Sequence, residues 1–138
     1  MGKSIRELMS ANPCTIEGDK PVAYAAKMMK DEDVGLAPVV EGDRLVGTLT
    51  DRDIVIRVVA EGKDPQSVTV REVASTDLVT IDPQQDLDEA LRLMASHQVR
   101  RLPVVEGGRL VGVVAQADVA REGKDKKTGE LVEEISEA

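Results

Sequence analysis

The chain contains one ten-residue segment twice, PVVEGDRLVG at 38–47 and PVVEGGRLVG at 103–112, with only Asp43 and Gly108 different. Aligned without gaps at this offset of 65 residues, the two halves share further identities. These include Arg6-Glu7 with Arg71-Glu72, Thr15-Ile16 with Thr80-Ile81, Met29 with Met94, and Asp53 with Asp118. Two copies are too few for a solenoid, so we expect two similar units that share one core around a pseudo-twofold axis.

The repeat defines the expected domain organisation. One unit spans 4–60 and the other 69–122, joined by a linker at 61–68 that is rich in Gly, Pro and charge. The residues that follow, 123–138, are charged and punctuated by glycine, and we expect a mobile tail there.

Both units predict the same order of elements. Short apolar runs at 14–16 and 78–81 indicate a strand, and helical spacing predicts helices at 20–31 and 86–97. Asp86, with Glu89 three residues later, indicates a capping box at the start of the second of these helices. The duplicated segment predicts a β-hairpin in each unit, followed by a helix from near Asp51 or Gln116.

The composition limits both the core and the function. Tyr24 is the only aromatic residue, so Val, Ile, Leu, Ala and Met must form the core, including Val39, Val40, Leu45, Val46 and their partners in the second hairpin. A net charge of −8 argues against binding to nucleic acid. No apolar run approaches the ~20 residues that span a bilayer, so we expect a cytoplasmic protein with no membrane partner.

Catalytic chemistry has little support in the sequence. Cys14 and His97 are the only cysteine and histidine, which is too few for a usual structural zinc site, and no phosphate-binding glycine loop or nucleophile motif occurs. We therefore expect no metal, no catalytic residue and no enzyme activity.

The segment GTLTDRDI at 47–54 is the most informative candidate site. Thr50 and Asp53 have the spacing of a helix-capping box. The same residues also suit a nucleotide, because a helix N-terminus offers N–H groups to phosphate and a carboxylate can hold the hydroxyls of a ribose. The spacing alone leaves both interpretations open.

The second copy differs in two ways. Asp118 is present, but Ala115 replaces the threonine, which weakens both a cap and a phosphate contact. Before Pro103 stand Arg100 and Arg101, where the first copy has Gly35 and Leu36. The two arginines are either surface cations or a phosphate clamp.

The order of Thr-Ile strand, helix, Pro-Val-Val hairpin and Gly-x-x-Thr-x-x-Asp resembles the CBS domain, and two copies over 4–122 resemble a CBS pair, or Bateman module. The segments TDRDIV (50–55) and HQVRRLPV (97–104) are similar to the hypoxic response protein type of actinobacteria, among the small stand-alone bacterial CBS-pair proteins. The resemblance implies an α/β (α+β) fold, with two β-α-β-β-α repeats packed with pseudo-twofold symmetry, and association into disc-shaped homodimers.

It also implies a regulatory ligand, AMP, ADP, ATP or S-adenosylmethionine, held in clefts that both repeats line. The resemblance gives one cleft Thr50, Asp53, Val79, Thr80, Arg100, Arg101 and Pro103. Within it, Asp53 would bind the ribose, Thr50 and Arg101 would approach phosphate, and Val79 and Pro103 would contact the base. A second, weaker cleft would combine Cys14, Thr15, Leu36, Pro38 and Asp118.

Two functions remain open at this point. The leading hypothesis is a non-catalytic sensor of an adenosine-containing ligand. The alternative is a dimeric interaction or stress-response protein that has lost nucleotide binding and acts through a protein partner.

Overall fold

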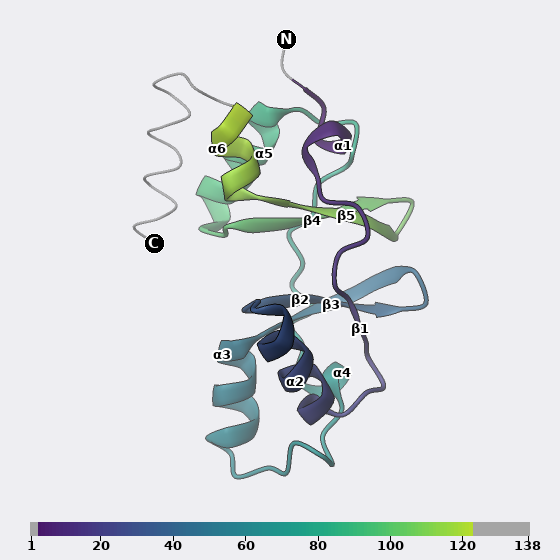
Figure 1. The fold of residues 1–138 in the computed structure, drawn as a ribbon, viewed down its shortest axis with the longest axis vertical. Coiled ribbons are helices and arrows are strands. Elements are labelled where there is room, and N and C mark those ends of the chain that lie inside the picture. The colour runs from purple at the N-terminus through teal and green to yellow at the C-terminus, as the bar shows by residue number, and fades with distance from the viewer. Residues whose placement is uncertain (1–2, 123–138) are drawn as a thin grey trace. The chain divides into compact units, whose positions relative to one another are not determined.

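The computed structural model describes residues 3–122, and the expected tail at 123–138 lies outside them. The described chain divides into two compact units (Figure 1). One is Cys14–Leu78, called here the first unit. The other, the second unit, combines residues 3–13 with 79–122.

The first unit is a small sheet with helices on one face (Figure 1). Its elements are β1 (Ile16–Glu17), α2 (Val22–Glu32), β2 (Leu36–Glu41), β3 (Arg44–Thr50), α3 (Asp51–Ile54), a π-helix η1 (Val55–Val59) and α4 (Val70–Val73). Strand β1 is parallel to β2, and β2 is antiparallel to β3. The predicted strand at 14–16 is thus shifted, because Cys14 and Thr15 lie before β1.

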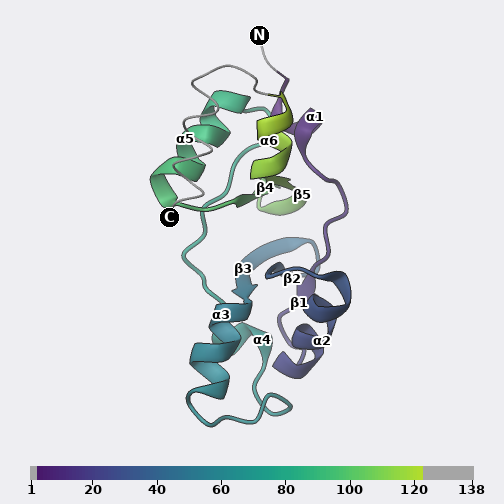
Figure 2. The ribbon, with the colours of Figure 1, turned by 60° about the vertical axis from the view of Figure 1, so that its left-hand side comes forward.

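The second unit repeats this plan with one strand fewer. It contains α1 (Ile5–Leu8), α5 (Leu87–His97), β4 (Arg101–Glu106), β5 (Arg109–Ala115) and α6 (Gln116–Glu122), with the helices on one face of the hairpin (Figure 2). The predicted strand at 78–81 is confirmed only at Ile81, which forms a single parallel bridge to Val104, while residues 78–80 form no strand pairing. The capping box at α5 is half formed. Asp86 accepts from the Glu89 N–H at 3.0 Å, but the Glu89 carboxylate binds Arg92 instead of returning to Asp86.

The two hairpins confirm the prediction from the repeated segment. Each has a two-residue turn and a register shift at the same place, between Val39 and Val40 or between Val104 and Val105. The single difference in the segment falls in the turn. Gly107 and Gly108 both have positive φ, whereas in the first hairpin only Gly42 does. That geometry favours glycine at position 108.

The short helices α1 and α4 were not predicted, and each packs with the remainder of the other repeat. The Ile5 N–H donates to the Gln85 carbonyl at 2.8 Å, and 65 residues later the Val70 N–H donates to the Lys20 carbonyl at 2.8 Å. The Ser10 bridge to Val113 and the Ser75 bridge to Thr48 continue the exchange. The compact units therefore differ from the sequence repeats by an exchange of their first residues.

The buried residues form one cluster in each unit, where the repeat predicted a single shared core, and both clusters consist of aliphatic side chains and methionine, as the composition predicts. The first includes Ile16, Val22, Met29, Val39 and Leu49, and the second Ile5, Leu91, Met94, Leu102 and Val104. The hairpin prediction holds in part. Val39, Val40 and Val104 are buried, while Leu45, Val46 and their partners are half-buried. Among the described residues, no helix is long and apolar enough to cross a membrane.

Candidate functional site

The turn from β3 into α3 forms a complete capping box. The Asp53 N–H donates to Thr50 Oγ1 at 3.0 Å, and the Thr50 N–H donates to Asp53 Oδ2 at 3.0 Å. Both side chains are half-buried. These bonds satisfy two groups that a helix start would otherwise leave without partners, and they fix the Asp53 carboxylate at the end of the strand.

The neighbouring strand holds this turn in place. Thr50 pairs with Leu36 at the start of β2, and the Asp51 N–H donates to the Gly35 carbonyl at 3.0 Å. A methyl group on Gly35 would come within 3.2 Å of Asp51 Oδ2, closer than most contacts of a β-carbon. Gly35 thus allows the acidic turn to lie directly against the end of α2 and the start of β2.

The equivalent turn in the second unit lacks half of this arrangement. The Ala115 N–H donates to Asp118 Oδ2 at 3.1 Å, but there is no hydroxyl to receive the Asp118 N–H. The other carboxylate oxygen, Asp118 Oδ1, accepts from Arg121 at 2.5 Å. Both oxygens of Asp118 are therefore engaged by its own helix turn.

Asp53 differs from Asp118 in this respect. Position 56, which aligns with Arg121, is Ile56, so no basic residue follows Asp53 at the same spacing. Within the described residues, Asp53 Oδ1 forms no hydrogen bond or ion pair, while Oδ2 is held by the cap. Asp53 can thus accept a hydrogen bond from a ligand hydroxyl without breaking its own turn, whereas Asp118 would have to give up an ion pair.

The other predicted site residues divide between the two units. Cys14, Thr15, Leu36 and Pro38 belong to the same unit as Thr50 and Asp53, and Leu36 lies opposite Thr50. Asp118 shares its unit with Val79, Thr80, Arg100, Arg101 and Pro103, and Arg101 lies opposite Ala115. Thr80, Arg100 and Arg101 are exposed, Val79 is half-buried and Pro103 is buried. The crossed grouping into two clefts stays a prediction.

A hollow beside the Thr50 turn was missed in the sequence. It measures about 440 Å³ and lies between α2 and α3. Its lining residues are Ala26, Met29, Lys30, Asp33, Val34, Gly35, Asp51, Ile54 and Val55. The pattern could have indicated it, because small residues at 26 and 35 leave room where the helix end meets the acidic turn.

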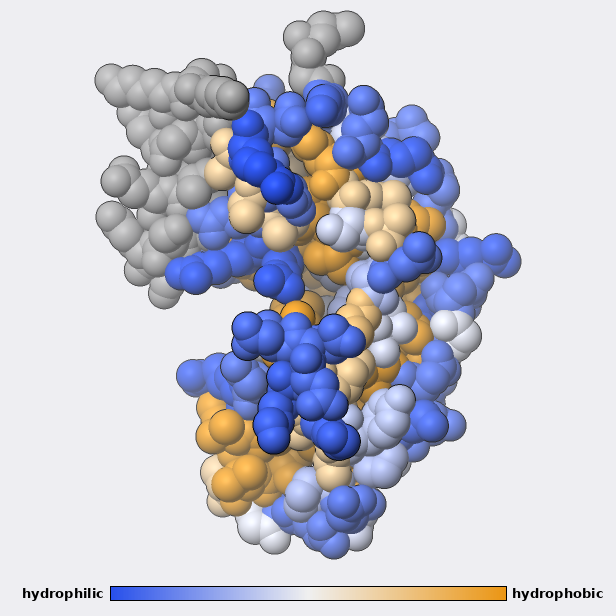
Figure 3. Space-filling view, viewed as in Figure 1, coloured by the Kyte–Doolittle hydropathy of each residue, from blue (hydrophilic) through white to orange (hydrophobic). Residues whose placement is uncertain are grey.

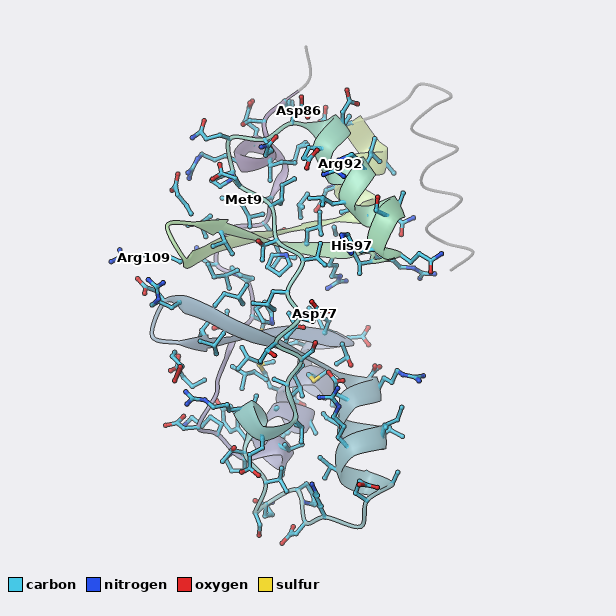
Figure 4. The ribbon with its side chains drawn as sticks, turned by 180° about the vertical axis from the view of Figure 1, so that it is seen from behind. Met9, Asp77, Asp86, Arg92, His97 and Arg109 are labelled. Carbon is cyan, nitrogen blue, oxygen red and sulfur yellow. The ribbon has the colours of Figure 1, made fainter. Side chains whose placement is uncertain are left out.

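Cys14 has little reactivity in this setting. It is exposed, with Sγ 3.6 Å from Met28 Sδ. Partial burial of the thiol, with a smaller contribution from Glu32, raises the pKa of Cys14 above its ordinary value. A thiol that remains protonated is a weak nucleophile and a weak metal ligand. His97 belongs to the other unit, at the end of α5 (Figure 4).

Two hairpins, each followed by a Gly-x-x-Thr/Ala-x-x-Asp turn, define a tandem α/β repeat protein. The model of the CBS domain matches the chain twice, over residues 5–60 and 70–125. The chain therefore belongs to the CBS-domain family, as a tandem pair.

Relatives cover most of the chain. A CBS domain-containing protein of Bacillus subtilis, YhcV, is 45% identical over 85% of this chain and 83% of its own length. Hypoxic response protein 1 of Mycobacterium tuberculosis is 41% identical over 84% of this chain and 82% of its own. The crystal structure of hypoxic response protein I with two coordinated zinc ions superposes with a TM-score of 0.80, at 39% identity, over 88% of this chain and 99% of that one. The resemblance drawn from the residues, including its type, is confirmed.

Proposed function

We propose that this protein is a non-catalytic regulatory module that senses an adenosine-containing ligand such as AMP, ADP, ATP or S-adenosylmethionine. The ligand binds at the Thr50–Asp53 turn, and its binding changes how the module meets a protein partner. A cytoplasmic location and self-association belong to the same proposal.

The difference between Asp53 and Asp118 supports the choice of the first turn. Asp53 keeps one carboxylate oxygen without a partner among the described residues, while Arg121 occupies the corresponding oxygen of Asp118. A ribose offers two adjacent hydroxyl donors, and a carboxylate is a strong acceptor for them. The Thr50 turn adds a helix start that suits a phosphate.

The family resemblance supplies the remaining contacts of the proposed site. It pairs Thr50 and Asp53 with Val79, Thr80, Arg100, Arg101 and Pro103 of the second repeat. A more distant fold neighbour, CBSX2, was solved in complex with AMP; at 22% identity it supports the fold, and AMP enters here only as one candidate. The exposed Arg101 is the residue that we propose for phosphate.

Calorimetry with matched variants tests this proposal. Wild type is titrated with AMP, ADP, ATP, NAD and S-adenosylmethionine, and so are Asp53→Asn, its counterpart Asp118→Asn, and Arg101→Ala. Asparagine keeps an acceptor for the backbone N–H of the cap, so the fold should survive, as circular dichroism would show. We expect saturable binding of at least one ligand, lost or at least tenfold weaker in Asp53→Asn and nearly unchanged in Asp118→Asn.

Three results would contradict the proposal. The first is that no ligand of the panel gives heat or a thermal shift. The second is that Asp118→Asn abolishes binding while Asp53→Asn does not, which would move the site to the other turn. A third is unchanged binding of a phosphate-bearing ligand by Arg101→Ala, which would remove Arg101 from the site.

The solved relative with two coordinated zinc ions raises the question of a metal site in this chain. The described residues contain no group of three or more His, Cys, Asp or Glu side chains that could hold a metal ion, and Cys14 and His97 lie in different units. These residues do not fit a metal site within one unit, so no step of the proposal depends on zinc.

The second candidate is an interaction protein that has lost its ligand. Ala115 and the Arg121–Asp118 ion pair favour it for the second turn, because they leave that turn without a hydroxyl and with an occupied carboxylate. A pull-down that recovers the same partner with wild type and Asp53→Asn, with or without nucleotide, would support this candidate over the sensor.

A further inference from the structure

Arg57 connects the helix that follows the Thr50–Asp53 turn to the end of α4. Its Nη1 donates a hydrogen bond to the Val73 carbonyl oxygen at 3.1 Å. Val73 is the last residue of α4, where a helix leaves carbonyl groups without a partner inside the helix. The guanidinium of Arg57 thus satisfies a backbone acceptor at the point where the chain leaves α4 on its way to the second unit.

Arg57 is the one polar residue of the π-helix η1. Val58 is fully buried, whereas Val55, Ile56 and Val59 are exposed and give the hydrophobic surface at the lower left of Figure 3. Only Arg57 can therefore donate a side-chain hydrogen bond from this helix. π-Helices are rare and are frequent at functional sites. The single polar side chain of this one is used to hold the backbone of another segment.

The strand before the turn holds the same segment from its other side. The Thr48 N–H donates to the Ser75 carbonyl at 2.9 Å, and the Ser75 N–H donates to the Thr48 carbonyl at 2.8 Å. The packing is close, because a methyl group on Gly47 would lie 2.9 Å from the Ser75 carbonyl oxygen and 3.3 Å from the Ala74 Cβ. Residues 73–75 are therefore bound to both elements that flank the Thr50–Asp53 turn.

The second repeat has the strand contact but a different helix contact. The Ser10 N–H donates to the Val113 carbonyl at 2.8 Å, as Ser75 does to Thr48. The residue aligned with Arg57 is Glu122, whose carboxylate has no N–H to donate to a carbonyl and accepts from Lys3 Nζ at 3.0 Å. This ion pair joins two exposed side chains, and such pairs contribute little stability. The arginine contact to the backbone is thus a feature of the first repeat, which also has the complete capping box.

We propose that Arg57 is a positioning residue that makes residues 73–75 follow the Thr50–Asp53 turn. The inference rests on the proposed function for the ligand that moves the turn, and it adds to that function the route of regulation. Residues 76–78 lead from this segment into the second unit, where Val79 and Thr80 belong to the proposed site. With contacts on both sides of the turn, a shift of the turn moves the segment and the path by which the chain enters the second unit.

A double-mutant cycle without ligand tests this coupling. Thr50→Ala disturbs the turn, and Arg57→Met removes the donor while it keeps an unbranched side chain. Hydrogen exchange of the full chain, followed by NMR, reports on the Ser75 amide. We expect Arg57→Met to speed its exchange by about threefold to tenfold, as the loss of one hydrogen bond does. Thr50→Ala should speed the same exchange in wild type but add little in Arg57→Met, because turn and segment are then uncoupled.

Three matched variants act as controls. Arg44→Met removes an arginine from an exposed position at the start of β3 and should leave the exchange of the Ser75 amide unchanged. Glu122→Gln, at the aligned position of the second repeat, should not change the exchange of the Ser10 amide. Arg57→Lys keeps a donor and should restore most of the protection of Ser75.

Two results of the cycle would overturn the inference. One is that Thr50→Ala speeds the exchange of Ser75 equally with and without Arg57. The other is that Arg57→Met speeds the exchange of the Met29 amide in α2 as much as that of Ser75, because Arg57 would then only stabilise the unit as a whole. Neither result depends on a ligand, so a panel without binding would remove the proposed function and leave the cycle to decide the inference.

A ligand separates the positioning role from a contact in the site. The probe is AMP, or S-adenosylmethionine where calorimetry shows that it binds more tightly. We expect the probe at saturation to shift the exchange of Ser75 at least about threefold more in wild type than in Arg57→Met, while the two dissociation constants agree within about threefold. Equal shifts in both proteins would refute the positioning role, and so would loss of binding in Arg57→Met, which would make Arg57 part of the site itself.

Discussion

Removal of the Thr50 hydroxyl is the most informative single change, because the second repeat already shows the shortened form of the same turn. In Thr50→Ala, the Asp53 N–H loses its acceptor at 3.0 Å. The other bond of the box, from the residue 50 N–H to Asp53 Oδ2, can remain, as the Ala115 N–H bond to Asp118 does at 3.1 Å. The perturbation therefore isolates one hydrogen bond at one helix start.

The expected loss of stability follows from the capping role. Loss of an N-cap hydroxyl costs about 1 kcal/mol of unfolding free energy. With an m-value of about 2 kcal/mol/M for urea, the unfolding midpoint should fall by roughly 0.5 M. Thr50→Ser, which keeps the hydroxyl, should lose much less, and Ala115→Thr should gain up to about 1 kcal/mol by completing the box with Asp118.

Urea unfolding followed by circular dichroism measures these differences. All variants must be compared at one protein concentration and without nucleotide, because self-association and ligand binding both shift apparent stability. If Thr50→Ala unfolds at the wild-type midpoint, or Thr50→Ser is as damaging as Thr50→Ala, the cap does not stabilise the protein as argued.

The same variants separate the cap from the ligand. If the hydroxyl also contacts phosphate, Thr50→Ala should weaken ATP or AMP binding more than Ala115→Thr changes it. If the hydroxyl acts only as a cap, the two variants should differ in stability while the binding of wild type and Thr50→Ala stays equal.

Three further predictions concern the close packing of Gly47 against the backbone of Ser75, the stability of the fold at acidic pH, and the reactivity of the Cys14 thiol. Gly47→Ala should cost about 1–3 kcal/mol, because the added methyl would lie 2.9 Å from the Ser75 carbonyl oxygen, which is tied to Thr48; unfolding at the wild-type midpoint would contradict this. Hydrogen bonds from the Thr69 backbone and side chain lower the pKa of Glu72, so its contribution to stability is present above about pH 4.3 and is lost as pH falls through the lower pKa of the folded state. The melting-temperature difference between wild type and Glu72→Gln should therefore shrink on acidification, and a constant difference would refute the link. Removal of the negative charge of Glu32 by Glu32→Gln should lower the raised pKa of Cys14 and speed its alkylation by iodoacetamide at fixed pH, whereas an unchanged rate would leave burial as the sole cause.

The repeat was sufficient to predict the two hairpins, their turns and the helices that follow, because these elements depend on local residues. Turn glycines, the alternation of apolar residues and the Thr50–Asp53 spacing act within a few positions of the chain. The predicted helices 20–31 and 86–97 correspond to Val22–Glu32 and Leu87–His97, with boundaries that differ by one or two residues.

The predictions from local sequence patterns failed where an element depends on contacts with residues far away in the sequence. The run at 78–81 is apolar enough for a strand, but only Ile81 meets a partner, so no ladder forms. The half-formed box at α5 failed for another reason. Arg92, three residues after Glu89, donates two hydrogen bonds to the Glu89 carboxylate, which therefore does not bind the Asp86 N–H. A bidentate ion pair is stronger than the single bond that closes a box.

The short helices α1 and α4, in the exchanged segments, have a signal in the repeated sequence that hydrophobic periodicity does not detect. Each of these segments starts with a capping box, Ser4 with Glu7 in one and Thr69 with Glu72 in the other. The two boxes align with each other at the 65-residue offset. Four-residue helices are too short for a hydrophobic period, so only the cap indicates them. The sequence does not show where these helices pack, because the contacts are with distant parts of the chain. Ile5, for example, is fully buried and donates a hydrogen bond to a residue 80 positions away.

That exchange bears on how the module can respond to a ligand. The chain passes from one compact unit to the other at 13–14 and again at 78–79, so neither unit is completed by one repeat alone. Residue 75 is bridged to Thr48, two positions before the Thr50 turn, and residues 79–81 follow shortly after in the other unit. A ligand that displaces the Thr50–Asp53 turn would therefore act on the segment that enters the second unit. The two backbone hydrogen bonds between Thr48 and Ser75 join β3 to this segment, and the chain then continues from Ser75 into the second unit. This connection is the physical contact through which a ligand at the proposed site would act on the rest of the module.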